Sequence, residues 1–277
     1  MSAFRQSFNA LALAALWAAG PAAADAPQRV VSINLCTDQL AMMLAAPGQL
    51  ISVSYLASDP LSSTMVEAAA DYPPNRGGAE QVFLMRPDLV LAGTYSSRAS
   101  VGLLRKLGVT VVEVPIVQSL EDVGTTLRIV GAAMGREAEA EALAQGFEDE
   151  IAAISPPKRV ASAAMYYANG YTAGAGGLTD QILALTGFAN IGADAGVTGG
   201  GILPLERLVM AEPEMIVTST PYPAHSRAEE ILQHPALLAL RDQSAQARAS
   251  HADWVCGTPH LIRAIRQMQQ ARAGMGE

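Results

Sequence analysis

Short runs of β-branched and aliphatic residues alternate with helical segments in the first part of the chain. The runs with the length and composition of buried strands are 29–35, 50–55, 87–92 and 109–114. Apolar positions recur with helical spacing at 37–44, 80–85 and 103–107, and Thr37 or Asp38 is the expected N-cap of the first helix. Strands that alternate with helices are typical of a mostly parallel sheet covered on both faces. The pattern therefore predicts an N-terminal α/β lobe at 27–117.

From residue 119 to residue 154 the pattern indicates helix alone. Ala, Glu, Leu and Arg dominate this stretch, and it contains no β-branched run of strand length. We expect Gly135 to divide it into a helix that packs on the first lobe and a second helix, 137–154, about 27 Å long at 1.5 Å per residue. The segment 118–155 is therefore predicted to be a rigid helical connection.

A second α/β pattern begins after Pro156 and Pro157, with a strand expected at 159–166. The block 205–217 repeats the design of the block 79–90: a Glu begins a short helix, and a Pro-acid pair then leads into an apolar strand. The repeat predicts a C-terminal lobe at 156–277. The expected fold class is α/β, with two lobes that each contain a mostly parallel sheet flanked by helices, joined by one long rigid helix.

Composition narrows the class of protein. The chain has 277 residues, of which 50% are hydrophobic and 16% are charged, which fits a globular protein with a large core rather than a disordered one. The formal net charge is −8, so the chain lacks the basic surface that binds phosphates, and no nucleic-acid partner is expected. The two cysteines are too few for a four-thiolate zinc site.

The N-terminus has the features of a secretory signal. Arg5 is followed by an apolar run at 8–20 and then by small residues at 22–24. The run is shorter than the roughly 20 residues that span a bilayer, which disfavours the alternative of an uncleaved anchor. We expect a signal peptide at 1–24, with cleavage after Ala24 or Ala26, and a periplasmic location. Trp254 is then the only tryptophan of the mature chain.

The order of these features along the chain resembles that of the periplasmic substrate-binding proteins of ABC importers that carry cobalamin and ferric siderophores. The resemblance rests on the first strand at 29–34, the blocks around Glu80 and Glu206, the helical connection and the pair Asp253-Trp254. It implies a monomeric binding protein without a cofactor, which captures a metal chelate or corrinoid between its lobes and delivers it to an inner-membrane ABC permease. It also implies that Glu80 and Glu206 dock on permease arginines. The alternative for both is an ordinary first-turn carboxylate, favoured by the helix dipole.

Candidate ligand contacts come from aromatic and loop residues. The Gly-rich stretch 169–177 lacks the Gly-Lys-Ser/Thr ending of a phosphate loop, so it is either an irregular loop or a ligand-facing one. Of the adjacent Tyr166 and Tyr167, one should face the sheet core, because neighbouring strand residues point to opposite faces. The resemblance places Asp253 and Trp254 in the cleft. The full expected site is Cys36, Thr37, Tyr55, Tyr95, Arg98, Tyr167, Tyr171, Asp253, Trp254 and Cys256.

These residues favour some classes of ligand over others but do not identify the ligand. Arg98 is the main candidate cation of the first lobe, and anionic siderophores often need several cations, so the site favours a neutral or amphipathic ligand such as a corrinoid. Haem would require a His or Tyr axial ligand. The four His lack the spacing of a zinc protease, and no set of metal ligands is defined.

Cys36 and Cys256 are expected to open onto the cleft from opposite lobes. Thr258 is the expected cap of the last helix, which would place both cysteines near helix N-termini. A bond between them requires Cα atoms within about 7 Å, which would leave the cleft too narrow for a bulky chelate. We therefore predict two thiols, able to contact a soft metal or act as a redox latch. The alternative is one structural disulfide, which an oxidising periplasm favours.

Two other functions share this pattern. One is a periplasmic hydrolase-like enzyme on a two-lobed α/β scaffold, but no Gly-x-Ser-x-Gly elbow surrounds any Ser, and we expect no catalytic residue. The other is an accessory metal-binding or sensor protein with the same fold and no permease partner.

Overall fold

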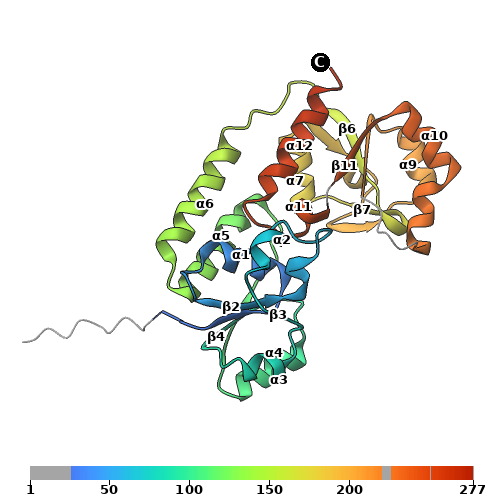
Figure 1. The fold of residues 1–277 in the computed structure, drawn as a ribbon. Coiled ribbons are helices and arrows are strands. Elements are labelled where there is room, and N and C mark those ends of the chain that lie inside the picture. Colours follow the sequence, from blue (N-terminus) through green and yellow to red (C-terminus); the bar gives the residue numbers. More distant parts are fainter. Residues whose placement is uncertain (1–25, 220–225, 250, 277) are drawn as a thin grey trace, which may run out of the picture.

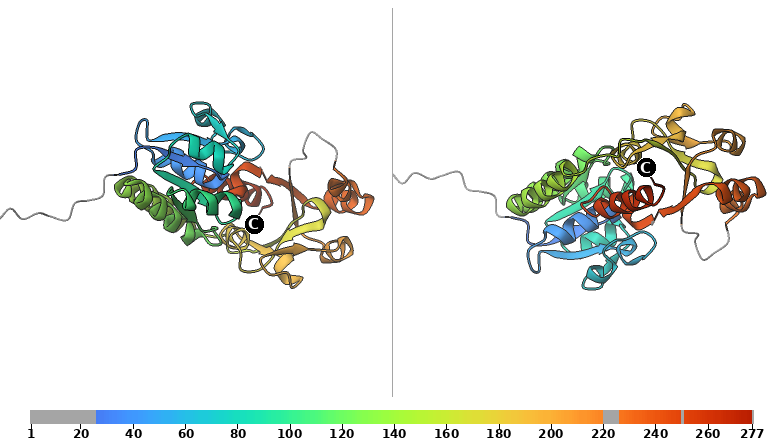
Figure 2. Two further views of the ribbon diagram at one scale, coloured as in Figure 1. Left: turned by 90° about the horizontal axis from the view of Figure 1, so that it is seen from below. Right: turned by 90° about the horizontal axis from the view of Figure 1, so that it is seen from above.

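The computed structural model describes residues 26–219, 226–249 and 251–276, so the expected signal peptide at 1–24 lies outside the described residues. Figure 1 shows two α/β lobes with helix α6 (Glu137–Ala152) running along one side from the first lobe towards the second. In both views of Figure 2 the C-terminal helix α12 (Leu261–Ala273) lies centrally, between the first lobe and the rest of the second. Within the described ranges, no helix combines the length and the apolar character needed to cross a bilayer.

The first lobe contains a five-stranded parallel sheet in the order β3-β2-β1-β4-β5. Its strands are β1 (Val30–Ser32), β2 (Leu50–Ser54), β3 (Pro74–Asn75), β4 (Leu89–Gly93) and β5 (Thr110–Val114). Its helices are α1 (Leu35–Leu44), the 3-10 turn η1 (Tyr55–Ser58), α2 (Val66–Ala69), α3 (Ala79–Leu84) and α4 (Arg98–Lys106). The four predicted strands and three predicted helices are confirmed, and α4 begins earlier than the pattern indicated.

Both faces of this sheet are buried. Val30 and Leu89 point into one hydrophobic cluster, and Val31 and Val90, their neighbours in sequence, point into another. The first cluster includes side chains of α1 and of α5 (Leu120–Met134), and the second includes side chains of α3 and α4. Burial on both faces explains why these strands appear in the sequence as continuous apolar runs.

The helical connection divides where the sequence predicted. Helix α5 ends at Gly135, which has φ 66, a left-handed conformation that glycine adopts without steric cost. Helix α6 then runs back along α5, and Arg128 forms ion pairs with Glu141 at 2.6 Å and Glu148 at 2.9 Å. The two helices therefore form one packed unit rather than a flexible linker.

The second lobe contains a four-stranded parallel sheet in the order β11-β10-β6-β8, and an antiparallel ribbon of β7 and β9. Its strands are β6 (Ala161–Met165), β7 (Tyr171–Ala173), β8 (Phe188–Asn190), β9 (Gly200–Ile202), β10 (Met215–Ser219) and β11 (Ala245–Ala249). Its helices are the 3-10 turns η2 (Ala168–Gly170) and η3 (Arg227–Gln233), with α7 (Leu178–Leu185), α8 (Ile191–Asp194), α9 (Leu205–Ala211), α10 (Pro235–Gln243), α11 (His251–Val255) and α12. The prediction that Thr258 caps the last helix is wrong, because α12 begins at Leu261 after His260.

The repeat seen in the sequence is also present in the structure. Glu80 and Glu206 are exposed in the first turns of α3 and α9, and two residues later each helix buries a fully enclosed aliphatic side chain. Each helix is followed by a non-glycine residue with positive φ, Arg86 at 52° and Glu212 at 44°. The two lobes therefore share a local design down to the backbone.

The hydrophobic cores of the lobes are continuous. One buried cluster contains Leu40 of the first lobe, Phe147 of α6, and Met165 and Leu261 of the second lobe. Because these side chains exclude water together, the lobes meet through a shared core.

Candidate functional site

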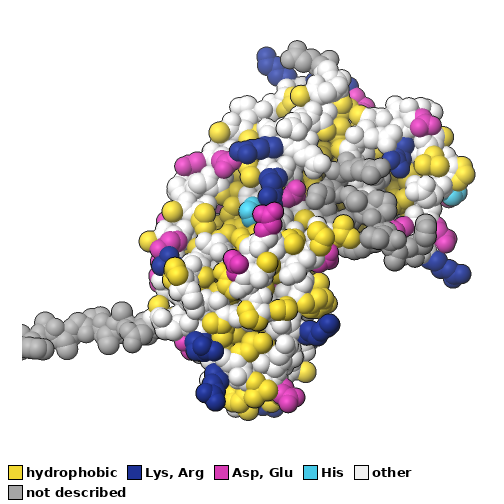
Figure 3. Space-filling view, in the orientation of Figure 1, with side chains coloured by type: hydrophobic (Ala, Val, Ile, Leu, Met, Phe, Trp, Pro, Cys, Tyr) yellow, Lys and Arg dark blue, Asp and Glu magenta, His cyan; other side chains and the backbone are white. Residues whose placement is uncertain are grey.

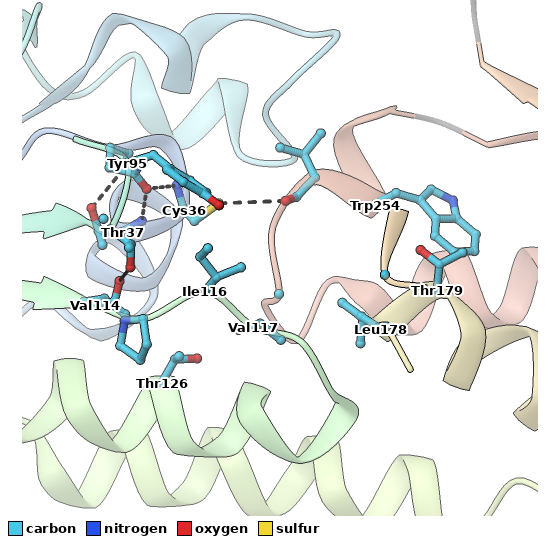
Figure 4. Close-up of a pocket in the computed structure, with 18 of the residues that line it drawn as sticks. Cys36, Thr37, Tyr95, Val114, Ile116, Val117, Thr126, Leu178, Thr179 and Trp254 are labelled. Carbon is cyan, nitrogen blue, oxygen red and sulfur yellow. Dashed lines mark hydrogen bonds between the residues drawn. The ribbon is translucent and has the colours of Figure 1, made fainter. Parts of the chain in front are cut away.

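A pocket of about 410 Å³ lies between the two lobes (Figure 4). Pockets for small molecules fall in the range of about 300–1,000 Å³. The first lobe and α5 contribute Asn34, Cys36, Thr37, Leu40, Gly93, Thr94, Tyr95, Val114, Pro115, Ile116, Val117 and Thr126. The second lobe contributes Tyr167, Tyr171, Ala173, Gly177, Leu178, Thr179, Gly199, Trp254, Val255 and Gly257. The pocket therefore needs both lobes.

The start of α1 forms part of the first-lobe wall. The Asn34 side chain is the N-cap and accepts hydrogen bonds from the backbone N–H groups of Cys36 at 3.0 Å and Thr37 at 3.4 Å. The expectation that Thr37 or Asp38 caps this helix is wrong, because Asn34 lies just before the first helical turn and satisfies its N–H groups. Thr37 instead donates its hydroxyl to the Asn34 carbonyl at 2.9 Å. This cap fixes how Cys36 and Thr37 face the pocket.

Two tyrosines line the second-lobe wall. Tyr166 is 1% exposed and packs in the core, whereas Tyr167, its neighbour, lines the pocket, which confirms the expected alternation. Tyr171 also lines the pocket, and its carbonyl accepts a hydrogen bond from Tyr167 N at 2.9 Å. Burial raises the pKa of the Tyr167 phenol well above its usual range, so the group stays protonated. Of the two expectations for the Gly-rich stretch, the structure thus supports the ligand-facing one.

Trp254 lies in α11, and Figure 4 shows it on the second-lobe side with Leu178 and Thr179. Its indole is partly buried, and its Nε1 is buried without a hydrogen-bond partner among the described residues. The adjacent Asp253 is not part of the pocket lining, because its carboxylate forms an ion pair with Arg263 at 2.9 Å.

Cys36 and Cys256 form a disulfide, with their Cα atoms 5.1 Å apart. The prediction of two thiols is therefore wrong. A bond between the lobes was expected to close the cleft. The cleft stays open beside the bond, because Cys36 lines a pocket of about 410 Å³. Cys256 is 2% exposed and lies behind the pocket wall, so the bridge joins the lobes without filling the space between them.

Other expected contacts lie away from this pocket. Tyr55 is in η1, where its ring is 5.1 Å from the guanidinium carbon of Arg76. Arg98 is an exposed residue at the start of α4. Neither residue lines the pocket, whereas Cys36, Thr37, Tyr95, Tyr167, Tyr171 and Trp254 all do.

Sequence reasoning missed the apolar connection after β5, which provides Pro115, Ile116 and Val117, and also missed Thr94 after β4. Both segments follow the carboxyl ends of parallel strands, where ligands bind open α/β sheets. That rule, applied to each predicted strand, would have found them.

Among the residues that the structure describes, the pocket lining contains no Asp, Glu, Lys, Arg or His. No group of three or more metal-ligating side chains occurs within the described ranges either. The site therefore offers aromatic faces, aliphatic surface and the hydroxyl groups of Thr and Tyr. Such a lining suits a ligand that is apolar or amphipathic and carries neutral polar groups.

A two-lobed α/β chain with a pocket between the lobes is the architecture of a solute-binding protein. A family model described as periplasmic binding protein matches residues 30–241, and the chain belongs to this family. This result confirms the resemblance and the fold class inferred from the sequence, and it indicates an extracytoplasmic protein.

Individual relatives bind different ligands. The chain is 28% identical over 198 residues to a cobalamin-binding protein of Halobacterium salinarum, a match that covers 69% of this chain and 54% of that protein. The chain thus spans about half the length of this curated relative. The apo periplasmic heme-binding protein RhuT from Roseiflexus sp. RS-1 has a TM-score of 0.74 at 21% identity, covering 90% of this chain and 99% of that one. The vitamin B12-binding protein BtuF of Vibrio cholerae has a TM-score of 0.65 at 17% identity, covering 91% and 98%. At these identities the two structures show a shared fold.

Proposed function

We propose that this protein binds a metal chelate or corrinoid in the pocket between its lobes and delivers it to an inner-membrane ABC permease. The observation that carries the proposal is the interlobe pocket itself. Its described lining includes Tyr95, Tyr167, Tyr171 and Trp254, and no ionisable acid or base other than the tyrosines. Aromatic faces stack on flat ligands, and the tyrosine hydroxyls can hydrogen-bond to their edges.

Of a corrinoid, a ferric siderophore and haem, the corrinoid fits the pocket lining best. An anionic siderophore would bring negative charge into a pocket whose described lining has no cation, which carries a large desolvation cost. A corrinoid carries neutral amides, which the hydroxyls of Thr94 and Thr179 can pair with. The cobalamin-binding relative supports the same choice. Haem, the ligand named for a similar structure, would have to use a tyrosine as its axial ligand if it bound to the described lining, which contains no His.

Delivery requires contact with the permease, for which Glu80 and Glu206 are the proposed docking residues. Each is exposed, and four residues further along each helix lies an exposed apolar side chain: Leu84 at 72% and Met210 at 83%. Figure 3 shows hydrophobic side chains gathered at the lower end of the first lobe, where α3 lies. A carboxylate beside an apolar group on each lobe suits a partner with matching basic and apolar positions. The periplasmic location and the signal peptide at 1–24 belong to the same proposal.

The test is a titration of the mature protein with cyanocobalamin, a ferric hydroxamate siderophore and haem, followed by tryptophan fluorescence. Trp254 is the only tryptophan after the predicted signal peptide and lines the pocket, so a bound coloured ligand should quench its emission strongly. We expect cyanocobalamin to quench at micromolar concentration or below. A ligand that binds by calorimetry without changing the emission would contradict the placement of the site.

A further inference from the structure

The disulfide connects two parts of the pocket wall that are 220 residues apart in the sequence. On the first-lobe side, Cys36 is in the first turn of α1 and Thr37 follows it in the lining. On the second-lobe side, Cys256 directly follows α11, and the residues around it, Trp254, Val255 and Gly257, line the pocket. The bond therefore attaches the segment 254–257 to the opposite lobe at the site itself.

The polar contacts between the two segments that the disulfide joins are weak. Thr258 and Gln39 bring their side-chain oxygens within 3.5 Å, at the outer limit of a hydrogen bond. Four buried side-chain nitrogens among the described residues have no partner: Gln39 Nε2 in α1, Trp254 Nε1 in segment 254–257, His260 Nε2 three residues after that segment, and Arg272 Nε in α12. Unpaired buried polar groups disfavour the folded arrangement that contains them.

The backbone at Gly257 also approaches the first lobe closely. A Cβ atom at this position would lie 2.2 Å from Val117 Cβ, so only glycine allows the segment to pass so near the connection after β5. This contact keeps the two walls close but gives no polar attachment. The covalent bond is thus the strongest link between segment 254–257 and the first lobe.

We propose that the Cys36–Cys256 disulfide positions the Trp254 wall of the pocket, so that the oxidised and reduced proteins bind the same ligand with different affinities. The part that concerns affinity rests on the proposed function. The two cysteines are positioning residues: they act on the ligand through the wall that they hold in place. Pre-organisation of a binding wall raises affinity, because less ordering remains to be done when the ligand binds.

Opening the bond requires a dithiol reductant. Cys36 is partly exposed, and Cys256 is buried, so the reductant's thiolate attacks the Cys36 sulfur and Cys256 leaves as a thiolate that takes up a proton. The second thiol of the reductant then closes its own disulfide and releases Cys36, which also ends as a thiol. Two electrons and two protons pass to the protein, and the dithiol is oxidised.

The first measurement needs no ligand. Acrylamide quenching of Trp254 is compared in the oxidised wild type, in the wild type reduced with dithiothreitol, and in the double variant Cys36→Ser/Cys256→Ser. We expect the quenching constant to rise about two-fold in both forms that lack the bond, because the indole loses its fixed position. Equal quenching in all three would overturn the proposal. The reduced wild type provides the answer if the double variant does not fold.

The second measurement is the Kd for cyanocobalamin in the same three samples. We expect binding about ten-fold weaker without the bond, mainly through faster dissociation.

Met134→Ala is the matched control, because Met134 is fully buried in α5 and outside the pocket lining, so this variant loses stability without touching the wall. Its Kd should equal that of the wild type. Equal Kd values for oxidised and reduced protein would overturn the affinity claim. Failure of the oxidised wild type to bind would instead contradict the proposed function, and the acrylamide result then decides the positioning claim alone.

Discussion

Asp38 is a buried carboxyl group beneath the first-lobe wall of the pocket. It is in α1, is fully enclosed, and accepts hydrogen bonds from Ser54 N at 3.0 Å and Ser54 Oγ at 2.5 Å. Burial raises the pKa of this carboxyl from 3.8 to about 6, against the lowering effect of its hydrogen bonds to Ser32 and Ser54. The Asp38 carboxyl therefore holds its proton more tightly in the folded protein than in the unfolded chain.

This shift predicts how stability depends on pH. Because the pKa is higher in the folded state, the contribution of Asp38 to stability is complete below about pH 4 and is lost as the pH rises through 6, a change on the order of 2–3 kcal/mol. Asp38→Asn keeps the shape and removes the titration. We expect urea denaturation to give the variant its largest advantage over the wild type at pH 7.5, and a smaller or reversed one at pH 4.5.

Asp71→Asn is the control for a carboxylate on the surface, since Asp71 is exposed. This variant should follow the wild type across the pH range. A difference between Asp38→Asn and the wild type that stays constant from pH 4.5 to pH 7.5 would contradict the shifted pKa.

At the residue scale, sequence periodicity predicted which way a side chain faces better than residue type predicted which side chains contact the ligand. Alternation predicted that one of the adjacent Tyr166 and Tyr167 faces the core; Tyr166 does, and Tyr167 lines the pocket. A charge argument gave Arg98 as a ligand contact and the family resemblance gave Asp253, but no local pattern indicated that Asp253 pairs with Arg263. The partner of a charged side chain depends on tertiary packing, which a single sequence does not display.

At the element scale, helix α5 shows what local signals determine. The Ser119 side chain accepts a hydrogen bond from Asp122 N at 3.2 Å, and the Asp122 carboxylate accepts from Ser119 N at 2.9 Å, which is a complete capping box. A further bond from the backbone of Gln118 is the main reason that the pKa of Asp122 is below its usual value.

Removal of this cap should weaken the connection between the lobes. We expect Ser119→Ala to lower the free energy of unfolding by about 1 kcal/mol, because one N–H group of the first turn loses its acceptor. Thr125→Ala is the control, since Thr125 is an exposed residue within the same helix and alanine has the higher helix propensity. Urea denaturation measures both. A Ser119→Ala protein as stable as Thr125→Ala would show that the cap contributes nothing.

Strands with a run of β-branched or aliphatic residues were predictable from the sequence, and strands without one were not. The division of the helical segment at Gly135, and the strands later found as β1, β2, β4, β5, β6 and β10, all follow from apolar patterns. The strands β3, β7, β8, β9 and β11 were missed. Their sequences (PN, YTA, FAN, GGI and AQARA) contain no β-branched or aliphatic run that marks a strand, and these strands form because neighbouring strands provide hydrogen bonds.

At the scale of the whole molecule, the repeat between the lobes predicts a docking surface. Reversal of both charges in Glu80→Arg/Glu206→Arg should reduce uptake of the bound solute by cells more than ten-fold, because the ion pairs that form on docking would become repulsive. The Kd for the ligand should not change, since neither residue lines the pocket. Glu67→Arg, on an exposed position of α2, is the control for uptake.

Two outcomes would contradict this assignment. Normal uptake by the double variant would exclude docking through these helices. A loss of ligand affinity would instead show that the two glutamates influence the binding site.

The relation between the lobes was the part that the sequence could not provide. The two sheets and their order along the chain followed from local pattern, but the approach of Cys256 to Cys36 depends on how the segment after α11 returns to α1. The prediction of thiols rested on an assumed cleft geometry, and the true geometry places the bridge beside the pocket. Distances between residues 220 positions apart follow from the packed core as a whole.

The central claim, that the solute binds between the lobes, is tested most directly by calorimetry of a pocket-blocking variant. Thr94 is an exposed residue of the pocket lining, so Thr94→Trp should fill part of the space without disturbing the core. Thr125→Trp places the same side chain on the outer surface of α5. We expect one cyanocobalamin per chain in the wild type and in Thr125→Trp, and a Kd at least about ten-fold weaker in Thr94→Trp. Equal affinity in all three proteins would contradict binding in this pocket.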